Sequence, residues 1–320
     1  MATWIGIDIS KDTADIGWFE ESVKRHFKVS NDPEGFRKTI DSVPEDSRFV
    51  MEATGTYYLN FALFLAENGK HVSVVNPLRI KNYMRADLQR YKDDKSDSLS
   101  IAKFGSEKKP EPWTPVSEDA VRMQQLAGLI DLYGKQIVQQ SNQIHAVTRV
   151  KYASKDVLGL LKRSMKQLQA GKTEAEQEFI ALVRKSHGRE LDIIKSIPGI
   201  GESTAARLIT SVGDFGKFKS SRQVISYLGL SPTRKQSGTS LNSRGPISRM
   251  GGCRMRSFLY LCGISAMKYN GDCRAMWKRM KAAGKPGKVI IVAIANKLVR
   301  QAFAMVRSNS TYIKNYAICP

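Results

Sequence analysis

Four acidic residues in the first third of the chain have the types and spacing of a metal site. Asp8 lies inside the strand-like run WIGIDIS, and Glu52 ends the apolar run RFVME. Asp94 and Asp97 are three residues apart in YKDDKSDSL, so they share one face if a helix begins there. A carboxylate within a central strand is costly unless it is paired or bound to a metal. Hard oxygen ligands suit Mg²⁺ or Mn²⁺, and two such ions could activate a nucleophile and stabilise the leaving oxygen of a phosphodiester.

Each of these acids alone also has a structural explanation. An aspartate at the start of a helix is favoured by capping and by the helix dipole. The four together, in this order along the chain, favour the metal site, because bound cations would neutralise the mutual repulsion of the aspartates in YKDDKSDSL. The remaining candidates, Asp12, Asp15 and Asp93, are assigned to turns or to the surface.

The elements that would position the four acids read as β-β-β-α-β-α-β-α. Runs rich in Ile, Val and aromatic residues predict strands, and apolar residues at helical spacing predict helices. The predicted strands are 3–10, 14–20, 24–30, 48–53 and 71–77; the predicted helices are 33–42, 56–69 and 94–104. Three meandering strands before the alternation predict an α/β domain with an RNase H-like mixed sheet, whereas alternation alone would suggest a doubly wound fold.

The rest of the chain divides at a proline-rich segment. KKPEPWTPV (108–116) is a natural boundary, and residues 117–190 carry long helical patterns. These patterns predict a helical hairpin or coiled coil that acts as a spacer or dimerisation arm; an ordinary helical bundle is equally consistent with them. The expected domains are 1–106, 107–190 and 191–320, the last mainly helical.

Charge is distributed unevenly between these parts. The net charge is +21, of which residues 191–320 hold +18, residues 107–190 hold +4 and residues 1–106 hold −1. A surface of one sign indicates a polyanionic partner, and nucleic acid is expected rather than a membrane. No signal-peptide pattern, membrane-length apolar run or paired-cysteine zinc motif is evident, so a cytoplasmic protein with reduced thiols is expected.

Two motifs in the basic third indicate contacts with a nucleic acid. SIPGIGESTAARL (196–208) matches a helix-hairpin-helix, in which the turn containing Gly199 and Gly201 would hold a phosphate without reading sequence. Further along, Ser237 lies in a loop with basic residues that could bind a phosphate and activate the hydroxyl. On sequence physics alone, the simpler interpretation that Ser237 is one of several loop serines is favoured over a role as nucleophile. The basic residues expected to contact phosphates are Arg234, Lys235, Arg244, Arg249, Arg254 and Arg256.

These motifs resemble the DEDD transposases and site-specific invertases of insertion-sequence family 110, over nearly the whole chain. GIDIS supplies the first acid as Asp8, and MEATGTYY supplies the second as Glu52. KDDKSD matches a family pattern K-T-D-x-x-D, with Asp93 in place of the usual Thr. The segment from Ser237-Gly238 to Arg256 matches the family's serine motif, with Arg249 for the more usual Lys and Met255 for a common Leu.

The resemblance implies an RuvC-like domain joined through a coiled coil to a transposase domain. It implies that Ser237 forms a covalent link with DNA, assisted by metal ions on the four acids. Expected partners are donor and target double-stranded DNA, a structured bridge RNA as guide, and further copies of the chain in a dimer or tetramer in a prokaryotic cytoplasm. Two alternatives remain: an RuvC-like junction-resolving nuclease that hydrolyses DNA with two metal ions, and a non-catalytic DNA-binding module. The first leaves RKQSG without a role, and the second leaves the four acids unexplained.

Overall fold

The computed structural model describes residues 2–86, 94–237, 241–248 and 253–314 of the chain. It consists of two compact units, Met1–Val116 and Ser117–Pro320. The first is an α/β unit and the second is mainly helical, as the sequence predicts. The finer division into three domains stays a prediction.

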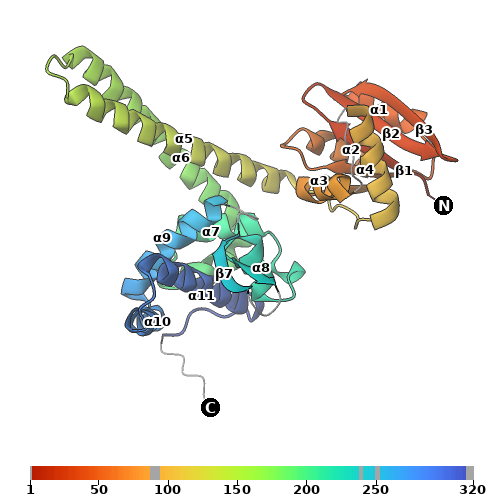
Figure 1. Cartoon of the computed structure of the whole chain (residues 1–320). Coiled ribbons are helices and arrows are strands. Elements are labelled where there is room, and N and C mark those ends of the chain that lie inside the picture. The colour runs from red at the N-terminus through yellow and green to blue at the C-terminus, as the bar shows by residue number, and fades with distance from the viewer. Residues whose placement is uncertain (1, 87–93, 238–240, 249–252, 315–320) are drawn as a thin grey trace. The chain divides into compact units, whose positions relative to one another are not determined.

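The first unit is built on a five-stranded mixed sheet of order β3-β2-β1-β4-β5 (Figure 1). The first three strands are antiparallel, whereas β4 and β5 run parallel to β1. This order matches the prediction except for one additional helix, Pro77–Ala86, between the last strand and the last predicted helix. Their bounds are β1 Trp4–Ile9, β2 Thr13–Glu20, β3 Val23–Ser30, α1 Pro33–Ser42, β4 Arg48–Glu52, α2 Tyr58–Glu67, β5 His71–Val75, α3 Pro77–Ala86 and α4 Asp94–Lys108.

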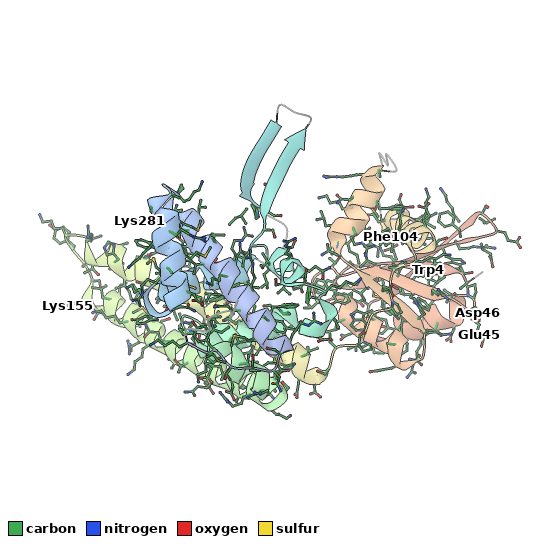
Figure 2. The ribbon with its side chains drawn as sticks, turned by 90° about the horizontal axis from the view of Figure 1, so that it is seen from below. Trp4, Glu45, Asp46, Phe104, Lys155 and Lys281 are labelled. Carbon is green, nitrogen blue, oxygen red and sulfur yellow. The ribbon has the colours of Figure 1, made fainter. Side chains whose placement is uncertain are left out.

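Helices cover both faces of this sheet because side chains alternate along each strand. Ile5 and Ile7 face α1 and α2, and both are fully buried against residues such as Phe61. Trp4 faces the other side, where it packs in a cluster with Phe104 of α4 (Figure 2). Asp8 is four residues beyond Trp4 in β1, so it belongs to the face that α4 covers.

Two glycines let α4 lie directly on the sheet. Gly6 of β1 and Gly17 of β2 are cross-strand partners. A Cβ atom at Gly6 would come within 2.0 Å of the Ser98 carbonyl oxygen, and one at Gly17 within 2.6 Å of Ser98 Oγ. No side chain larger than hydrogen fits at either position. The close approach of α4 therefore depends on this pair of glycines.

The proline-rich segment belongs to the first unit rather than lying between the two. The Trp113 amide donates a hydrogen bond to the Val72 carbonyl over 2.7 Å, and Ser73 Oγ donates to the Pro110 carbonyl over 3.0 Å. The segment therefore follows the edge strand β5 and ends at Val116.

The second unit contains a long antiparallel helical hairpin, α5 and α6, whose base merges with a helical body (Figure 1). Ser117 and Ser154 cap the two hairpin helices by accepting hydrogen bonds from Ala120 N and Val157 N. The element bounds are α5 Glu118–Thr148, α6 Lys155–Lys195, α7 Glu202–Val212, η1 Phe215–Lys217, α8 Ser221–Tyr227, β6 Pro232–Ser237, β7 Leu241–Ile247, α9 Cys253–Tyr269, α10 Gly271–Ala282 and α11 Gly287–Arg307.

The hairpin and the body share one hydrophobic core. Ile130 of α5 and Phe179 of α6 are buried in the same cluster as Leu208 and Leu298. The helix α6 also continues past residue 190, to Lys195. A fragment that began at residue 191 would therefore lose part of the core that holds the basic region together.

Within the described residues, α11 is the one helix long and apolar enough to cross a membrane. Its Ile294, Leu298 and Val299 lie in the hydrophobic core of the second unit. This packing explains the apolar composition of α11 without a membrane.

Candidate active site and nucleic-acid interface

Three of the four predicted acids line one cavity of about 670 Å³ in the first unit. They come from three elements: Asp8 from β1, Glu52 from β4 and Asp97 from α4. All three are partly exposed. Residues separated by up to 89 positions in the sequence are thus brought to one edge of the sheet.

The parallel pairing of β1 and β4 brings Asp8 and Glu52 together. The paired register runs from Trp4 opposite Arg48 to Ile7 opposite Met51, and the two acids are the next residues on each strand. Neighbouring parallel strands end at the same edge, so both carboxylates reach the same cavity. Thr54 Oγ1 donates a hydrogen bond to Glu52 Oε1 over 3.1 Å, which orients that carboxylate.

The helix α4 contributes the third acid. It begins at Asp94 and turns Leu99 and Ala102 inward, as the spacing predicts. Asp97 lies one residue before Ser98, where α4 contacts Gly6 and Gly17. The contact with the two glycines therefore sets the distance between Asp97 and the strand that carries Asp8. The Asp94 side chain lies outside the described residues.

The side chains that line the cavity are of the type that a hard divalent cation prefers, although the acids are not grouped around one ion position. No three His, Cys, Asp or Glu side chains of the described residues are close enough to hold one ion. The cavity nevertheless offers three carboxylates and the side-chain amide of Asn76, all of them oxygen donors. The residues thus fit Mg²⁺ or Mn²⁺ by ligand chemistry.

Asp15 is predicted to lie in a turn or at the surface, and this prediction is wrong. It lies in the middle of β2, is only 6% exposed, and stands opposite Asp8. Its carboxylate is held from β3 by His26 Nε2 at 2.8 Å and by Lys28 Nζ at 3.1 Å. Asp12 is exposed beside the β1–β2 turn as expected, and Asp93 lies outside the described residues.

Two basic residues at the acidic cavity were also missed. Lys81 and Arg85 of α3 line it and are exposed. They are four residues apart, so they lie on one face of the helix. Cations beside carboxylates suit a site that holds a phosphodiester next to metal ions. Their i, i+4 spacing, in the segment that follows Pro77, is the sequence signal that could have found them.

The predicted nucleophile and its basic neighbours, expected in a loop, lie instead on the strands of a two-stranded ribbon. Ser237 is the last residue of β6 and pairs with Leu241 of β7. The ribbon projects from the helices of the second unit (Figure 2). Arg234 and Arg244 occupy opposed positions, whereas Lys235 is two residues from Ser237 on the same strand. The side chains of Ser237, Arg234, Lys235 and Arg244 lie outside the described residues.

The predicted hairpin glycines have different surroundings. Gly199 has φ +106°, and a Cβ atom there would lie 2.6 Å from the Ala266 Cβ of α9. Packing against α9 thus accounts for that glycine. Gly201 is exposed at the N-terminus of α7, with no atom within 4 Å of an added Cβ and no side-chain cap. Of the two, Gly201 has the open surroundings that a phosphate contact requires.

The three arginines predicted near the start of α9 also differ. Arg254 is exposed and ion-paired with Asp131 of α5, with Nη1 2.8 Å from Oδ2. Arg256 is partly buried, and its Nε has no hydrogen-bond partner among the described residues. Arg249 lies outside the described residues.

Two family models match successive parts of the chain, and the first match extends beyond the first unit to the end of α5. The family model for DEDD enzymes of IS110 elements, described as "Transposase", matches residues 5–151, and "Transposase IS116/IS110/IS902 family" matches residues 191–278. The pilin gene-inverting protein of Moraxella bovis is 28% identical, with 98% of each chain covered. The transposase for insertion sequence element IS1111A of Coxiella burnetii is 24% identical, covering 96% of this chain and 90% of the relative.

Proposed function

Because this chain belongs to the IS110 family of DEDD transposases, and is an enzyme that acts on DNA, we propose that it cleaves and rejoins DNA strands through a covalent serine–DNA intermediate. Ser237 is the nucleophile, and the metal ligands are Asp8, Glu52, Asp94 and Asp97. The observation that carries the proposal is the single cavity lined by Asp8, Glu52 and Asp97.

Asp8, Glu52, Asp94 and Asp97 would hold Mg²⁺ or Mn²⁺, and such an ion would supply charge neutralisation at the reacting phosphate and a lower pKa for a coordinated hydroxyl. Asp8 and Glu52 supply oxygen ligands at the edge of the sheet, and Thr54 keeps the Glu52 carboxylate oriented. Lys81 and Arg85 bind the non-bridging oxygens of the DNA backbone at the same cavity.

Ser237 supplies the step that distinguishes rejoining from hydrolysis. Its Oγ attacks phosphorus, so that an Oγ–P bond forms as the bond from phosphorus to a deoxyribose oxygen breaks. The hydroxyl proton leaves Oγ, and the departing oxygen takes up a proton. The diester is conserved in the serine link, so attack by a deoxyribose hydroxyl of another strand restores DNA without a high-energy cofactor.

For each of the two units we propose a more specific fold than the α/β or mainly helical class. A mixed sheet with three antiparallel strands at one side and acids at its edge supports an RNase H-like, RuvC-like first unit. The turn at residues 197–201 supports a helix-hairpin-helix that holds a DNA phosphate at Gly201.

We infer the partners from the net charge of the basic region and from membership of the family. Residues 191–320 have a net charge of +18, which suits donor and target double-stranded DNA and a structured guide RNA. The long α5–α6 hairpin suits an arm between copies of the chain in a dimer or tetramer. A cytoplasmic site of action in a prokaryote follows from these partners.

Trapping the covalent intermediate tests the proposal. Full-length protein is incubated with a DNA substrate and Mg²⁺, denatured, and analysed by gel shift and mass spectrometry of the adduct. Wild type should give a denaturation-resistant adduct at Ser237, and Ser237→Ala should lose the adduct and recombination together. Ser248→Ala is the matched control, since it removes a hydroxyl from the same segment. Free phosphate-terminated ends without any adduct would instead identify the two-metal junction nuclease.

A further inference from the structure

Asp131 of α5 is shared between two arginines from different helices. Its Oδ1 lies 3.0 Å from Arg207 Nη1 of α7, and its Oδ2 lies 2.8 Å from Arg254 Nη1 of α9. The Asp131 side chain is 14% exposed, Arg207 is 7% exposed and Arg254 is 57% exposed. One carboxylate therefore neutralises only one of two positive charges.

The positive charge that Asp131 does not neutralise is energetically unfavourable at Arg207. The guanidinium lies over the Phe258 ring, 4.5 Å from its centroid, and Arg207 Nε has no hydrogen-bond partner among the described residues. A nearly buried cation that shares its counter-ion is stabilised by a further anion, because charges interact more strongly where water is excluded.

A cavity of about 620 Å³ lies beside this cluster, within the second unit. Its walls carry four cationic side chains and two carboxylates, so they have a net charge of +2. Lys172 and Glu176 pair with each other over 3.7 Å, which leaves the excess charge at Arg207, Arg254 and the exposed Lys135. Gln139 and Asn142 of α5 add amide donors to the same wall.

We propose that this cavity, at the base of the α5–α6 hairpin, binds a phosphate group of a nucleic-acid backbone. Arg254 is the residue that changes its partner. Its side chain is exposed, so the guanidinium can leave one oxygen of Asp131 and bind a phosphate oxygen instead. Asp131 then keeps Arg207 as its remaining partner, and the phosphate supplies the missing negative charge. Guanidinium groups suit this exchange because they bind carboxylate and phosphate with the same geometry.

The site goes beyond the proposed strand-exchange chemistry and depends neither on Ser237 nor on a metal. It is therefore tested in chelator, where no strand is cleaved. Fluorescence anisotropy measures the affinity of full-length protein for a labelled DNA duplex over a series of salt concentrations.

Arg254→Ala should weaken binding roughly three- to tenfold and reduce the slope of log affinity against log salt by about one. Asp131→Asn should have the opposite effect and tighten binding, because it removes the carboxylate that competes with phosphate. A purely structural ion pair predicts a lower melting temperature for Asp131→Asn, with unchanged or weaker binding. That result would overturn the proposal.

Lys135→Ala tests the same cavity without breaking the Asp131 pairs, should Asp131→Asn fail to fold. It should also weaken binding and lower the salt slope. Lys166→Ala, an exposed change on the same hairpin outside the cavity, measures the effect of losing one charge there. Equal effects of Lys135→Ala and Lys166→Ala would count against a specific site.

A titration with inorganic phosphate distinguishes two possible sources of the bound anion, a nucleic-acid backbone and free phosphate. It is titrated at constant ionic strength against wild type and Arg254→Ala, with melting temperature as the readout. A stabilisation that Arg254→Ala abolishes, combined with unchanged DNA affinity and salt slope in that variant, would assign the cavity to free phosphate. The backbone assignment would then be wrong.

Discussion

Asp8 and Asp15 stand directly opposite each other in the antiparallel β1–β2 pair. Cross-strand partners of this kind have Cβ atoms about 5 Å apart, and like charges there destabilise a sheet. His26 and Lys28 of β3 offset this cost by holding the Asp15 carboxylate from the far side. Asp15 thus adds negative charge next to a proposed metal ligand while its own oxygens are occupied.

Asp15→Asn should raise the Mg²⁺ concentration needed for half-maximal strand exchange by roughly fivefold, because it removes negative charge beside Asp8 but keeps the side chain's shape. The measurement is a Mg²⁺ titration of recombination, with the melting temperature followed in parallel. Asp12→Asn, in the exposed turn nearby, is the control and should behave as wild type. An Asp15→Asn protein with lower thermal stability and an unchanged Mg²⁺ requirement would show that Asp15 is only structural.

Asp8→Asn and Asp97→Asn should each reduce strand exchange by at least about a hundredfold, because each removes a charged oxygen ligand. DNA binding should change little, since the positive charge lies mainly in residues 191–320. Recombination and duplex binding are measured side by side, with and without chelator. Asp46→Asn, in an exposed loop of the same unit (Figure 2), serves as the control. Full recombination without a divalent cation would refute the metal assignment.

Gly17→Ala should destabilise the first unit by about 1–3 kcal/mol, because the added Cβ would lie 2.6 Å from Ser98 Oγ and 2.9 Å from Leu99 N. The displaced α4 should also lower strand exchange, since it carries Asp97. Gly128→Ala is the matched control: nothing lies within 4 Å of its Cβ in α5, so helix propensity predicts a gain of about 1 kcal/mol. Thermal unfolding measures both, and equal stability of the two variants would contradict the close contact.

Glu202→Gln should destabilise the second unit in a pH-dependent way. Hydrogen bonds from Arg184 and then Lys195 lower the pKa of Glu202 below its ordinary 4.5. A carboxyl whose pKa is lowered by folding stabilises the protein above the unfolded pKa and loses that effect as pH falls through the folded pKa. The variant should therefore melt roughly 1–3 °C below wild type at pH 7, and the difference should disappear in acid. Glu174→Gln, an exposed change on α6, is the control and should show no such pH dependence. If Glu202→Gln lowered the melting temperature by the same amount at every pH, the ion pairs would be excluded as the cause of the destabilisation.

Apart from helix α3, the order of elements in the first unit could be predicted, as could the acids at its strand ends, because both depend on neighbouring residues. Ile5, Ile7 and Ile9 alternate with Gly6 and Asp8, and this period of two already places the acid on the face opposite the isoleucines. The start of α4 at Asp94 follows in the same way from local spacing. The net charge of residues 191–320 follows directly from the number of their acidic and basic residues.

The tertiary structure decided which distant residues meet. Nothing near Asp15 in the sequence shows that β3 brings His26 and Lys28 to it, and the role of Gly17 depends on Ser98, 81 positions away. Asp131 is separated from Arg207 and Arg254 by 76 and 123 positions, so its sharing between them arises only when α5, α7 and α9 pack together. Periodicity tells which face of an element is buried, but the partner on that face is chosen by the packing of the whole unit.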